Sequence, residues 1–411
     1  MTEDAPSALF DQLFRSETAP ADPYPLYERL RSYGPIVRIS EDIWLTTSYD
    51  LSAQVLRESV FGNDADAAGR ARGGDGWRER PALRTLAGML LMANPPRHTQ
   101  LRGLLSGYFQ KNPINRTRES VRRHVAELLP ELVDSGTVDF VSGFAEQLPR
   151  RVVADFIGIP QQDRLRFRDR TLAFNVVFER DIGPAQLAEA DAAAEEIEAY
   201  VRELVVSART TPRADLISTL VEAADARQLP MDELVRLVFQ VYNASYQTVL
   251  GLLGNGMSAL LAHPDQYALL RADPGLVPGA VAEMLRWDPP VQTTGRHALV
   301  PTTVATEDID VDELVVTVLA AANRDPARYR QPDRFDVRRA GPRSLAFGFG
   351  IHYCIGAALA TIQGEESFRA LASPGLRIEA VRPPLRHPGA NMRSMETADI
   401  DIVSVTDRSF R

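Results

Sequence analysis

The sequence predicts a mainly α-helical fold with a minor β part, and three features of the 411-residue chain support this prediction. Apolar residues recur at helical spacing over several long segments, the longest of which covers residues 232–262. Short strand-like runs occur near the start of the chain and again in its last third. Hydrophobic residues make up 45% and charged residues 25% of the chain, which is typical of a globular protein that buries a large core.

The N-terminal part mixes a short helix with strands. A helix is expected over residues 22–31, where apolar residues recur at helical spacing after prolines. Residues 35–39 and 43–47 then predict a small hairpin. The Gly-rich residues 69–76 are expected to form a mobile loop. No low-complexity linker divides the chain, so we expect one domain over residues 1–411, with residues 1–20 as a flexible N-terminal arm.

Helices dominate from about residue 94 onward, and short strands return later in the chain. The periodicity of apolar residues predicts amphipathic or partly buried helices at 118–132, 187–208 and 216–224. Strands are expected at 299–303 and 314–318, and further sheet is expected in the tail from residue 376.

The helix over residues 232–262 is expected to begin with Asp232 as its N-cap and to end before His263 and Pro264. Its middle, Asn243-Ala-Ser-Tyr-Gln-Thr248, interrupts the apolar pattern. Polar residues at the centre of a buried helix are costly unless they serve water, a ligand or chemistry. The alternative is that Ser245 and Thr248 hydrogen-bond back to helix carbonyl groups.

Charge, cysteine content and the N-terminus exclude several classes of protein. The net charge of −9 argues against a general nucleic-acid binder. One cysteine excludes an internal disulfide framework and a Cys-rich zinc site. The acidic N-terminus lacks the features of a signal peptide, and no apolar stretch approaches the ~20 residues of a membrane span. We therefore expect a soluble cytoplasmic protein without a nucleic-acid or membrane partner.

The stretch Phe347-Gly-Phe-Gly-Ile-His-Tyr-Cys-Ile-Gly356 carries the most information about chemistry. Its glycines permit a tight turn, and the residues after Cys354 favour a helix. The cysteine is therefore expected at a helix N-terminus, where exposed N–H groups favour a thiolate. From these residues alone, the sulfur could be a nucleophile, a metal ligand or an inert core group.

This stretch resembles the FGxGxHxCxG heme-binding signature of the cytochrome P450 family. Further family-like segments run in order from about residue 20 to the end and resemble the soluble bacterial type. The resemblance implies the cytochrome P450 fold, a triangular helical domain with a long central helix over heme b, and Cys354 as the axial iron ligand. It also implies reductive activation of O2 and oxidation of a small-molecule substrate. The matching positions are Phe347, Gly348, Gly350, His352, Cys354 and Gly356.

Two further segments resemble the family's structural elements. Glu283-Met-Leu-Arg286 is similar to its ExxR element, and the i, i+3 spacing lets the two side chains pair. Pro332-Asp-Arg-Phe335 is similar to its PxRF segment. The resemblance implies that Arg334 joins Glu283 and Arg286 in a buried structural network behind the heme.

The resemblance also implies the residues that hold the heme propionates. His98 and Arg102 match the start of a family helix, and their spacing of four places them on one helix face. Arg296 and His352 match two further partners. Charge-assisted hydrogen bonds to carboxylates suit these side chains.

Ala244-Ser-Tyr-Gln-Thr248 resembles the family's Ala-Gly-x-(Glu/Asp)-Thr pattern over the heme. Thr248 matches the oxygen-activating hydroxyl and Ala244 the small residue at the heme face, whereas Ser245 replaces a glycine and Gln247 replaces the proton-relaying acid. An amide does not carry a proton near neutral pH, but it can orient water. Proton delivery would then use Thr248, Ser245, water or the substrate, and the reaction could be ring closure, aryl coupling or desaturation. The alternative is that Gln247 is a harmless surrogate.

The family's variable segments imply an apolar substrate pocket lined by residues 63–93, 174–178, 291–294 and 391–392. For each side chain the alternative is ordinary core packing. The expected lining residues are Trp77, Met89, Met92, Phe174, Phe178, Val291, Thr294 and Met392.

We expect no fused flavin or iron–sulfur domain, because the resemblance to the heme domain accounts for the 411 residues. Electrons are then expected from a separate ferredoxin and ferredoxin reductase. We expect a monomeric heme-thiolate monooxygenase of bacterial secondary metabolism. One alternative is peroxide-driven oxidation or a non-oxygenating heme reaction. Another is a heme- or ligand-binding protein without turnover that docks to a carrier protein.

Overall fold

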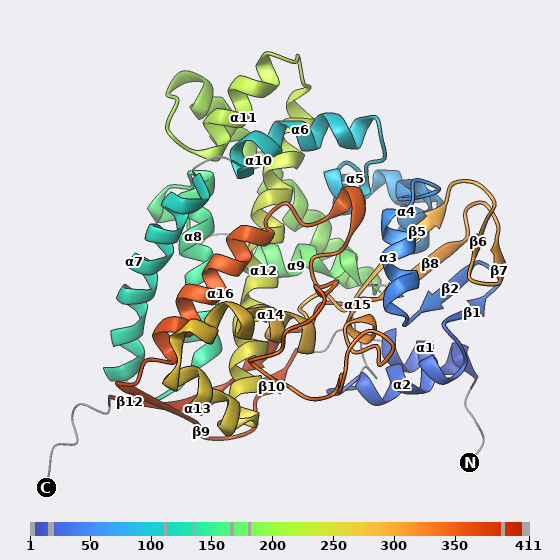
Figure 1. Cartoon of the computed structure of the whole chain (residues 1–411). Helices are drawn as coiled ribbons and strands as arrows, with labels where there is room; N and C mark the ends of the chain where they lie inside the picture. The colour runs from blue at the N-terminus through green and yellow to red at the C-terminus, as the bar shows by residue number, and fades with distance from the viewer. Residues whose placement is uncertain are drawn as a thin grey trace, which may run out of the picture.

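The computed structural model describes residues 5–14, 20–110, 113–134, 136–164, 168–179, 182–387 and 391–404. Helices form most of this part of the chain, and the strands gather in small sheets at its margins (Figure 1). The helices are α1 Pro6–Phe14, α2 Tyr24–Ser32, α3 Tyr49–Arg57, α4 Ala65–Gly73, α5 Pro81–Ala87, α6 Arg97–Gln110, α7 Pro113–Asp134, α8 Gln147–Ile157, α9 Arg168–Asn175, α10 Pro184–Thr210, α11 Leu216–Asp225, α12 Met231–Ala262, α13 Pro264–Ala272, α14 Val277–Trp287, α15 Leu319–Ala322 and α16 Ala357–Leu371.

Helix α12 is the central element of the helical body. Its 32 residues span roughly 48 Å at the usual helical rise. Helices α8, α10, α14 and α16 all pack against it, and Figure 1 shows it passing through the middle of the molecule. Most of its side chains are buried, so its stability comes chiefly from apolar packing.

The largest sheet has the order β1-β2-β8-β5-β3 and lies beside α1 and α2 (Figure 1). Strands β2 and β8 are parallel, with Trp44 opposite Val315, and the other pairs are antiparallel. A second sheet has the order β4-β12-β9, and Figure 1 shows β9 and β12 on the far side of the helical body from β1 and β2. The strands are β1 Ile36–Ser40, β2 Ile43–Thr46, β3 Phe61–Gly62, β4 Thr137–Asp139, β5 Thr293–Ala298, β6 Thr302–Val304, β7 Glu307–Ile309, β8 Leu314–Val318, β9 Leu376–Ala380, β10 Leu385–Arg386, β11 Met395–Thr397 and β12 Asp399–Ser404.

Most predicted elements are confirmed. The N-terminal helix, the hairpin β1-β2, strand β8 and the C-terminal sheet all form. The helices expected at 118–132, 187–208 and 216–224 lie within α7, α10 and α11. Local apolar periodicity was sufficient for these elements because each buries one continuous face.

The prediction of a mobile loop at residues 69–76 is wrong. Helix α4 continues to Gly73, and a short 3₁₀ turn follows it. Trp77 is buried against Gly69, where an added Cβ would lie 2.3 Å from the indole Cδ2. Glycine here serves close packing of a helix against an aromatic ring, and it does not loosen the chain.

Three boundary predictions need correction. Pro230, and not Asp232, is the N-cap of α12, and Asp232 instead forms an ion pair with Arg202 at 2.6 Å. Of the strand expected at 299–303, only residues 302 and 303 are in a strand, β6. Residues 299–301 connect β5 to β6, and the N–H of Leu299 donates to the carbonyl of Val60 where the chain turns. Within the expected flexible arm, residues 6–14 form α1, whose apolar face is buried. Residues 1–4 and 15–19 lie outside the described residues.

Among the described residues, none of the helices combines the length and the apolarity that a bilayer crossing requires.

Candidate active site

Cys354 lies in a tight loop directly before α16. Its N–H donates to the carbonyl of Phe347 at 2.9 Å, and its carbonyl accepts from the N–H of Ala357 at 3.3 Å. Gly348 and Gly350 both have φ of +69°. A Cβ at Gly350 would lie 2.2 Å from the Leu56 carbonyl oxygen, so this position requires glycine for both conformation and space.

The Cys354 side chain keeps exposed surface although it lies among many protein atoms. Burial raises the pKa of the thiol, whereas the backbone N–H of Gly356 and the charge of Arg102 lower it. The loop alone therefore does not hold a stable thiolate. A metal cation at the sulfur would favour the deprotonated form, which is the chemistry of a ligand cysteine.

The structure brings His98, Arg102, Arg296 and His352 to the same region. The rings of His98 and His352 are 4.3 Å apart, and Nη2 of Arg102 donates to the carbonyl of Tyr353 at 2.7 Å. Arg296 is buried, and among the described residues it donates only to Thr294 and Gly295 on its own strand. These four residues come from α6, β5 and the cysteine loop.

The electrostatics of this group suit an anionic ligand. Burial lowers the pKa of Arg296 to about 10. Burial and the charges of Arg296, His98 and Arg102 lower the pKa of His352 to about 3. The Nε2 atom of His98 is buried and has no hydrogen-bond partner in the part of the chain that the structure describes. Carboxylates of a ligand would provide the acceptors that these groups lack.

Asn63 also contributes to this region. It belongs to the pocket segment expected at residues 63–93 but is not one of the individual site residues expected from the sequence. Its Nδ2 group lies 3.2 Å from Nε2 of His352, which makes that ring nitrogen the acceptor. The amide thereby orients the imidazole. The sequence contains no local signal for this contact, because 289 positions separate the two residues.

The centre of α12 carries the polar group seen in the sequence. Ala244 is exposed, although the helix around it is largely buried. The hydroxyl of Ser245 donates to Val241 at 2.6 Å, and the hydroxyl of Thr248 donates to Ala244 at 2.8 Å. Both hydroxyls therefore make the helix back-bonds that were the alternative to a ligand role. Ala244 and Thr248 share one face, and that face borders open space.

The side chain of Gln247, next to Thr248 in the sequence, is hydrogen-bonded to another helix. Its Oε1 accepts a hydrogen bond from Nδ2 of Asn175, the last residue of α9. Asn175 lies within the expected pocket segment 174–178, but nothing in the sequence singled it out.

The expected pocket segments partly converge. Val291 bridges to Met392, and the Asn391 side chain accepts from Thr293 at 2.7 Å and donates to the carbonyl of Phe178 at 3.2 Å. These contacts join the start of β5, the turn at residues 391–392 and the segment after α9.

The other expected lining residues differ in their surroundings. Trp77 and Met89 are buried in the main core, and Phe174 is buried against Phe239 at 4.8 Å between ring centroids. Thr294 lies within β5, and its carbonyl accepts from Thr317 at 3.0 Å. For Trp77 and Phe174 the contacts match the packing alternative. Met92 is partly buried, in a turn held to α12 where the N–H of Leu91 donates to Gln240.

The Glu283–Arg286 pair is buried and bidentate, with N–O distances of 2.7 and 2.9 Å. The prediction for Arg334 is wrong for its side chain, which is exposed. Only its carbonyl oxygen joins the network, as an acceptor for Arg286. The second guanidinium of the network is that of Arg339, whose Nε donates to Glu283 at 3.0 Å.

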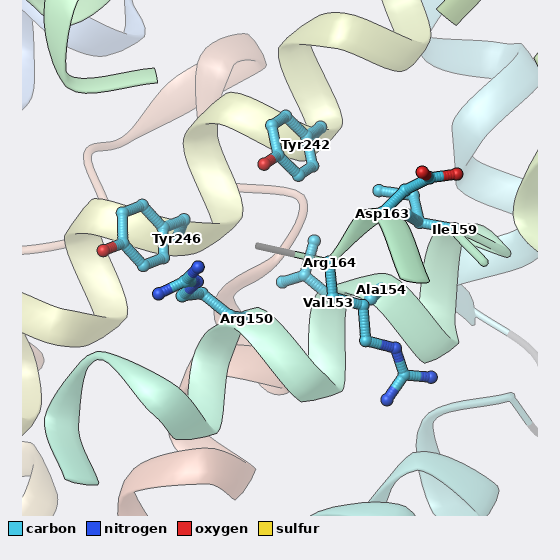
Figure 2. Close-up of a pocket in the computed structure, with 8 residues that line it drawn as sticks. All are labelled: Arg150, Val153, Ala154, Ile159, Asp163, Arg164, Tyr242 and Tyr246. Carbon is cyan, nitrogen blue, oxygen red and sulfur yellow. The ribbon is translucent and has the colours of Figure 1, made fainter. Parts of the chain in front are cut away.

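A separate pocket lies between α12 and α8 (Figure 2). Tyr242 and Tyr246 of α12 line it together with Arg150, Val153 and Ala154 of α8. At about 100° per residue, Tyr242 and Tyr246 lie on the side of α12 opposite Ala244 and Thr248. Its lining residues are different from those grouped around Cys354.

The residues present fit a heme. They combine a cysteine in a glycine-dependent loop with four basic or imidazole side chains that have few acceptors among the described residues.

Comparisons with known proteins agree with this geometry. The family model described as Cytochrome P450 matches residues 275–365. The chain is 38% identical to cytochrome P450 monooxygenase PikC of Streptomyces venezuelae over 369 residues, which are 85% of this chain and 83% of PikC. It is 34% identical to 6-deoxyerythronolide B hydroxylase of Saccharopolyspora erythraea, over 87% and 89% of the two chains. It also resembles the solved structure of P450BioI in complex with hexadec-9Z-enoic acid ligated acyl carrier protein, with a TM-score of 0.86, 28% identity, and coverage of 92% and 98% of the two chains.

Proposed function

Because this chain belongs to the cytochrome P450 family, we propose that it oxidises a small intermediate of bacterial secondary metabolism. It is an oxidoreductase of the monooxygenase class that uses heme b, O2, a small-molecule substrate and redox partners. Heme bound through a cysteine thiolate supplies the reductive activation of O2. The observation that carries the proposal is the meeting of Cys354 with Arg102, Arg296, His98 and His352.

The proposed roles of the basic residues follow from their contacts. Cys354 would ligate the iron, and Arg296, Arg102, His98 and His352 would hold the heme carboxylates. Arg296 is the strongest candidate, because its buried guanidinium has no carboxylate partner among the described residues and would gain most from an anion. Phe347, Gly348, Gly350 and Gly356 would shape the loop around the sulfur.

Proton delivery is proposed to depend on Thr248, Ser245, water or the substrate. In this conformation the Thr248 hydroxyl donates its proton to Ala244, so its oxygen is available as an acceptor. Gln247 carries no titratable proton near neutral pH. We therefore expect Gln247→Glu to change the ratio of product to released hydrogen peroxide. An unchanged ratio together with unchanged turnover would contradict atypical proton delivery.

Electrons are proposed to come from a ferredoxin and its reductase. The guanidinium of Arg343 lies 4.3 Å from the ring centroid of Tyr353, beside Cys354, and would give an acidic partner one positive contact. Arg122 and Arg123 instead pair with Glu366 and Asp155. Turnover that requires NAD(P)H, ferredoxin, reductase and O2 supports the proposal, whereas turnover with peroxide alone supports the peroxide-driven alternative.

The substrate class is proposed from the relatives. One relative is named for the hydroxylation of 6-deoxyerythronolide B, and P450BioI was solved with an acyl group on a carrier protein. A free biosynthetic intermediate is therefore the first proposal, and an intermediate carried on a protein is the second. We further propose that the chain acts as a single catalytic domain, as a monomer, in the cytoplasm.

The deciding experiment is the carbon monoxide difference spectrum of the dithionite-reduced protein. A Soret band at the position that gives the family its name supports heme with Cys354 thiolate ligation, and Cys354→Ala should remove that band. No heme band after heme addition would contradict the proposed function. A normal band with tight ligand binding but no product under any electron source would favour the alternative of a binding protein without turnover.

A further inference from the structure

Three side chains of α9 contact α12, and their positions 171, 174 and 175 place them on one face of α9. Thr171 hydrogen-bonds with Tyr242, Phe174 packs on Phe239, and Asn175 hydrogen-bonds with Gln247. The first two contacts lie on the side of α12 that also carries the tyrosines of Figure 2. At about 100° per residue, Gln247 lies between that side and the face of Ala244 and Thr248.

The Asn175–Gln247 contact satisfies only one end of the Asn175 amide. Asn175 is 7% exposed, and its Oδ1 is buried without a hydrogen-bond donor among the described residues. A buried acceptor without a partner is destabilising, and an apolar side chain of similar shape would avoid that cost. The bond to Gln247 is the one side-chain hydrogen bond of Asn175 among the described residues. This arrangement suits a positioning role better than a packing role.

The contact also determines which end of Gln247 is available. Oε1 of Gln247 accepts from Asn175, and Nε2 has no partner within the described part of the chain. A terminal amide that is held by its oxygen presents its NH2 group, which donates hydrogen bonds and carries no charge. Gln247 is half-buried and lies one position before Thr248. The geometry therefore provides a fixed neutral donor beside the proposed site of oxidation.

We propose that Asn175 is a positioning residue that holds Gln247 so that Nε2 donates to an uncharged acceptor oxygen of the substrate. The inference rests on the proposed function and specifies its substrate class, namely a molecule with a carbonyl, ether or hydroxyl oxygen near the oxidised carbon. Asn175 acts through Gln247 and does not itself contact the substrate.

The test uses the heme-loaded enzyme and two probes of similar size, cyclododecanone and cyclododecane. Dissociation constants are measured by isothermal titration calorimetry and by the ligand-induced Soret shift. The loss of one hydrogen bond corresponds to about a tenfold change in affinity. Wild-type enzyme should therefore bind the ketone about tenfold more tightly than the hydrocarbon.

Variants separate positioning from folding. Asn175→Leu and Gln247→Leu should each abolish the ketone preference, and the double variant should lose no more than either single one. Thr171→Val removes another polar contact between the same two helices and should keep the preference. Asn175→Leu should leave the free energy of unfolding unchanged or higher, since it removes a buried acceptor without a donor.

Two results would overturn the inference. One is an Asn175→Leu enzyme that keeps the ketone preference. The other is a double variant whose loss equals the product of the two single losses, since Asn175 would then act independently of Gln247. Neither result affects the carbon monoxide spectrum, so failure of the proposed function is recognised separately by an absent Soret band.

Discussion

The guanidinium of Arg339 donates from Nε to Oε1 of Glu283 at 3.0 Å, on the carboxylate that Arg286 also binds. Its Nη1 and Nη2 groups donate to the carbonyls of Arg330, Gln331 and Arg334. Arg339 thus joins the segment after the PxRF residues to α14. The exposed Arg334 has no comparable contacts, and its Nη1 makes one long bond of 3.4 Å to Gln331.

Removal of Arg339 should destabilise the protein more than removal of Arg334. Arg339→Ala removes one charge-assisted hydrogen bond from the buried Glu283 carboxylate, whose Oε1 still accepts from Arg286 and from the N–H of Asp336. We therefore expect the free energy of unfolding to fall by about 1.5–3 kcal/mol. Arg334→Ala should change it by less than about 0.5 kcal/mol, as is usual for surface substitutions. Urea denaturation of both variants checks this prediction, and equal losses would contradict it.

The two glycines before Cys354 should respond differently to alanine. Gly348→Ala introduces strain at φ +69° but no collision, since nothing lies within 4 Å of the new Cβ. Gly350→Ala adds an overlap with the Leu56 backbone. We expect losses of about 1–2 kcal/mol for Gly348→Ala and about 3 kcal/mol or more for Gly350→Ala. Heme content and thermal unfolding measure the effect of each variant. A larger loss of stability for Gly348→Ala than for Gly350→Ala would contradict the close packing of Gly350 against Leu56.

Arg296→Met should separate heme affinity from the stability of the heme-free protein. Burial disfavours the charged guanidinium and lowers its pKa to about 10, so its removal should leave the free energy of unfolding of the heme-free protein unchanged or higher. Loss of a charge-assisted bond should weaken heme binding by about 10–100-fold. Heme titration measures this, with exposed Arg338→Met as the control for net charge. Unchanged heme affinity would remove Arg296 from the proposed ligand set.

Asp155 should make stability depend on pH in the acid range. Burial raises the pKa of its carboxyl, but hydrogen bonds from His124 and Ser120 and the charge of Arg164 outweigh that effect and lower the pKa from 3.8 to about 2. A depressed pKa in the folded state stabilises the fold above the unfolded value of 3.8. This contribution is lost as the pH falls toward about 2.

Comparison of Asp155→Asn with wild type tests this linkage. At neutral pH the variant should be less stable by about 1–2 kcal/mol, and the difference should shrink as the pH falls through this window. Asp225→Asn breaks an exposed ion pair with Arg209 and should show little pH-dependent difference. If the difference in the free energy of unfolding between wild type and Asp155→Asn stays constant down to pH about 2, the depressed pKa of Asp155 is contradicted.

Local patterns were enough to predict the helices, the hairpin and the cysteine loop. Glu283 and Arg286 are three residues apart on one helix, so their pairing follows from helix geometry. The glycines before Cys354 have positive φ, which residue type alone indicates. Trp77 shows the limit of such patterns, because Gly-rich residues predicted a loop where close helix packing occurs.

The sequence by itself determined the fold class, the family resemblance and the residues proposed to surround a heme, because these depend on local periodicity and short motifs. Only the tertiary structure decided that Arg339 binds Glu283 and that Asn175 holds Gln247. These partners are separated by 56 and 72 positions. Their contact depends on how distant segments and helices pack, and no local spacing encodes that packing.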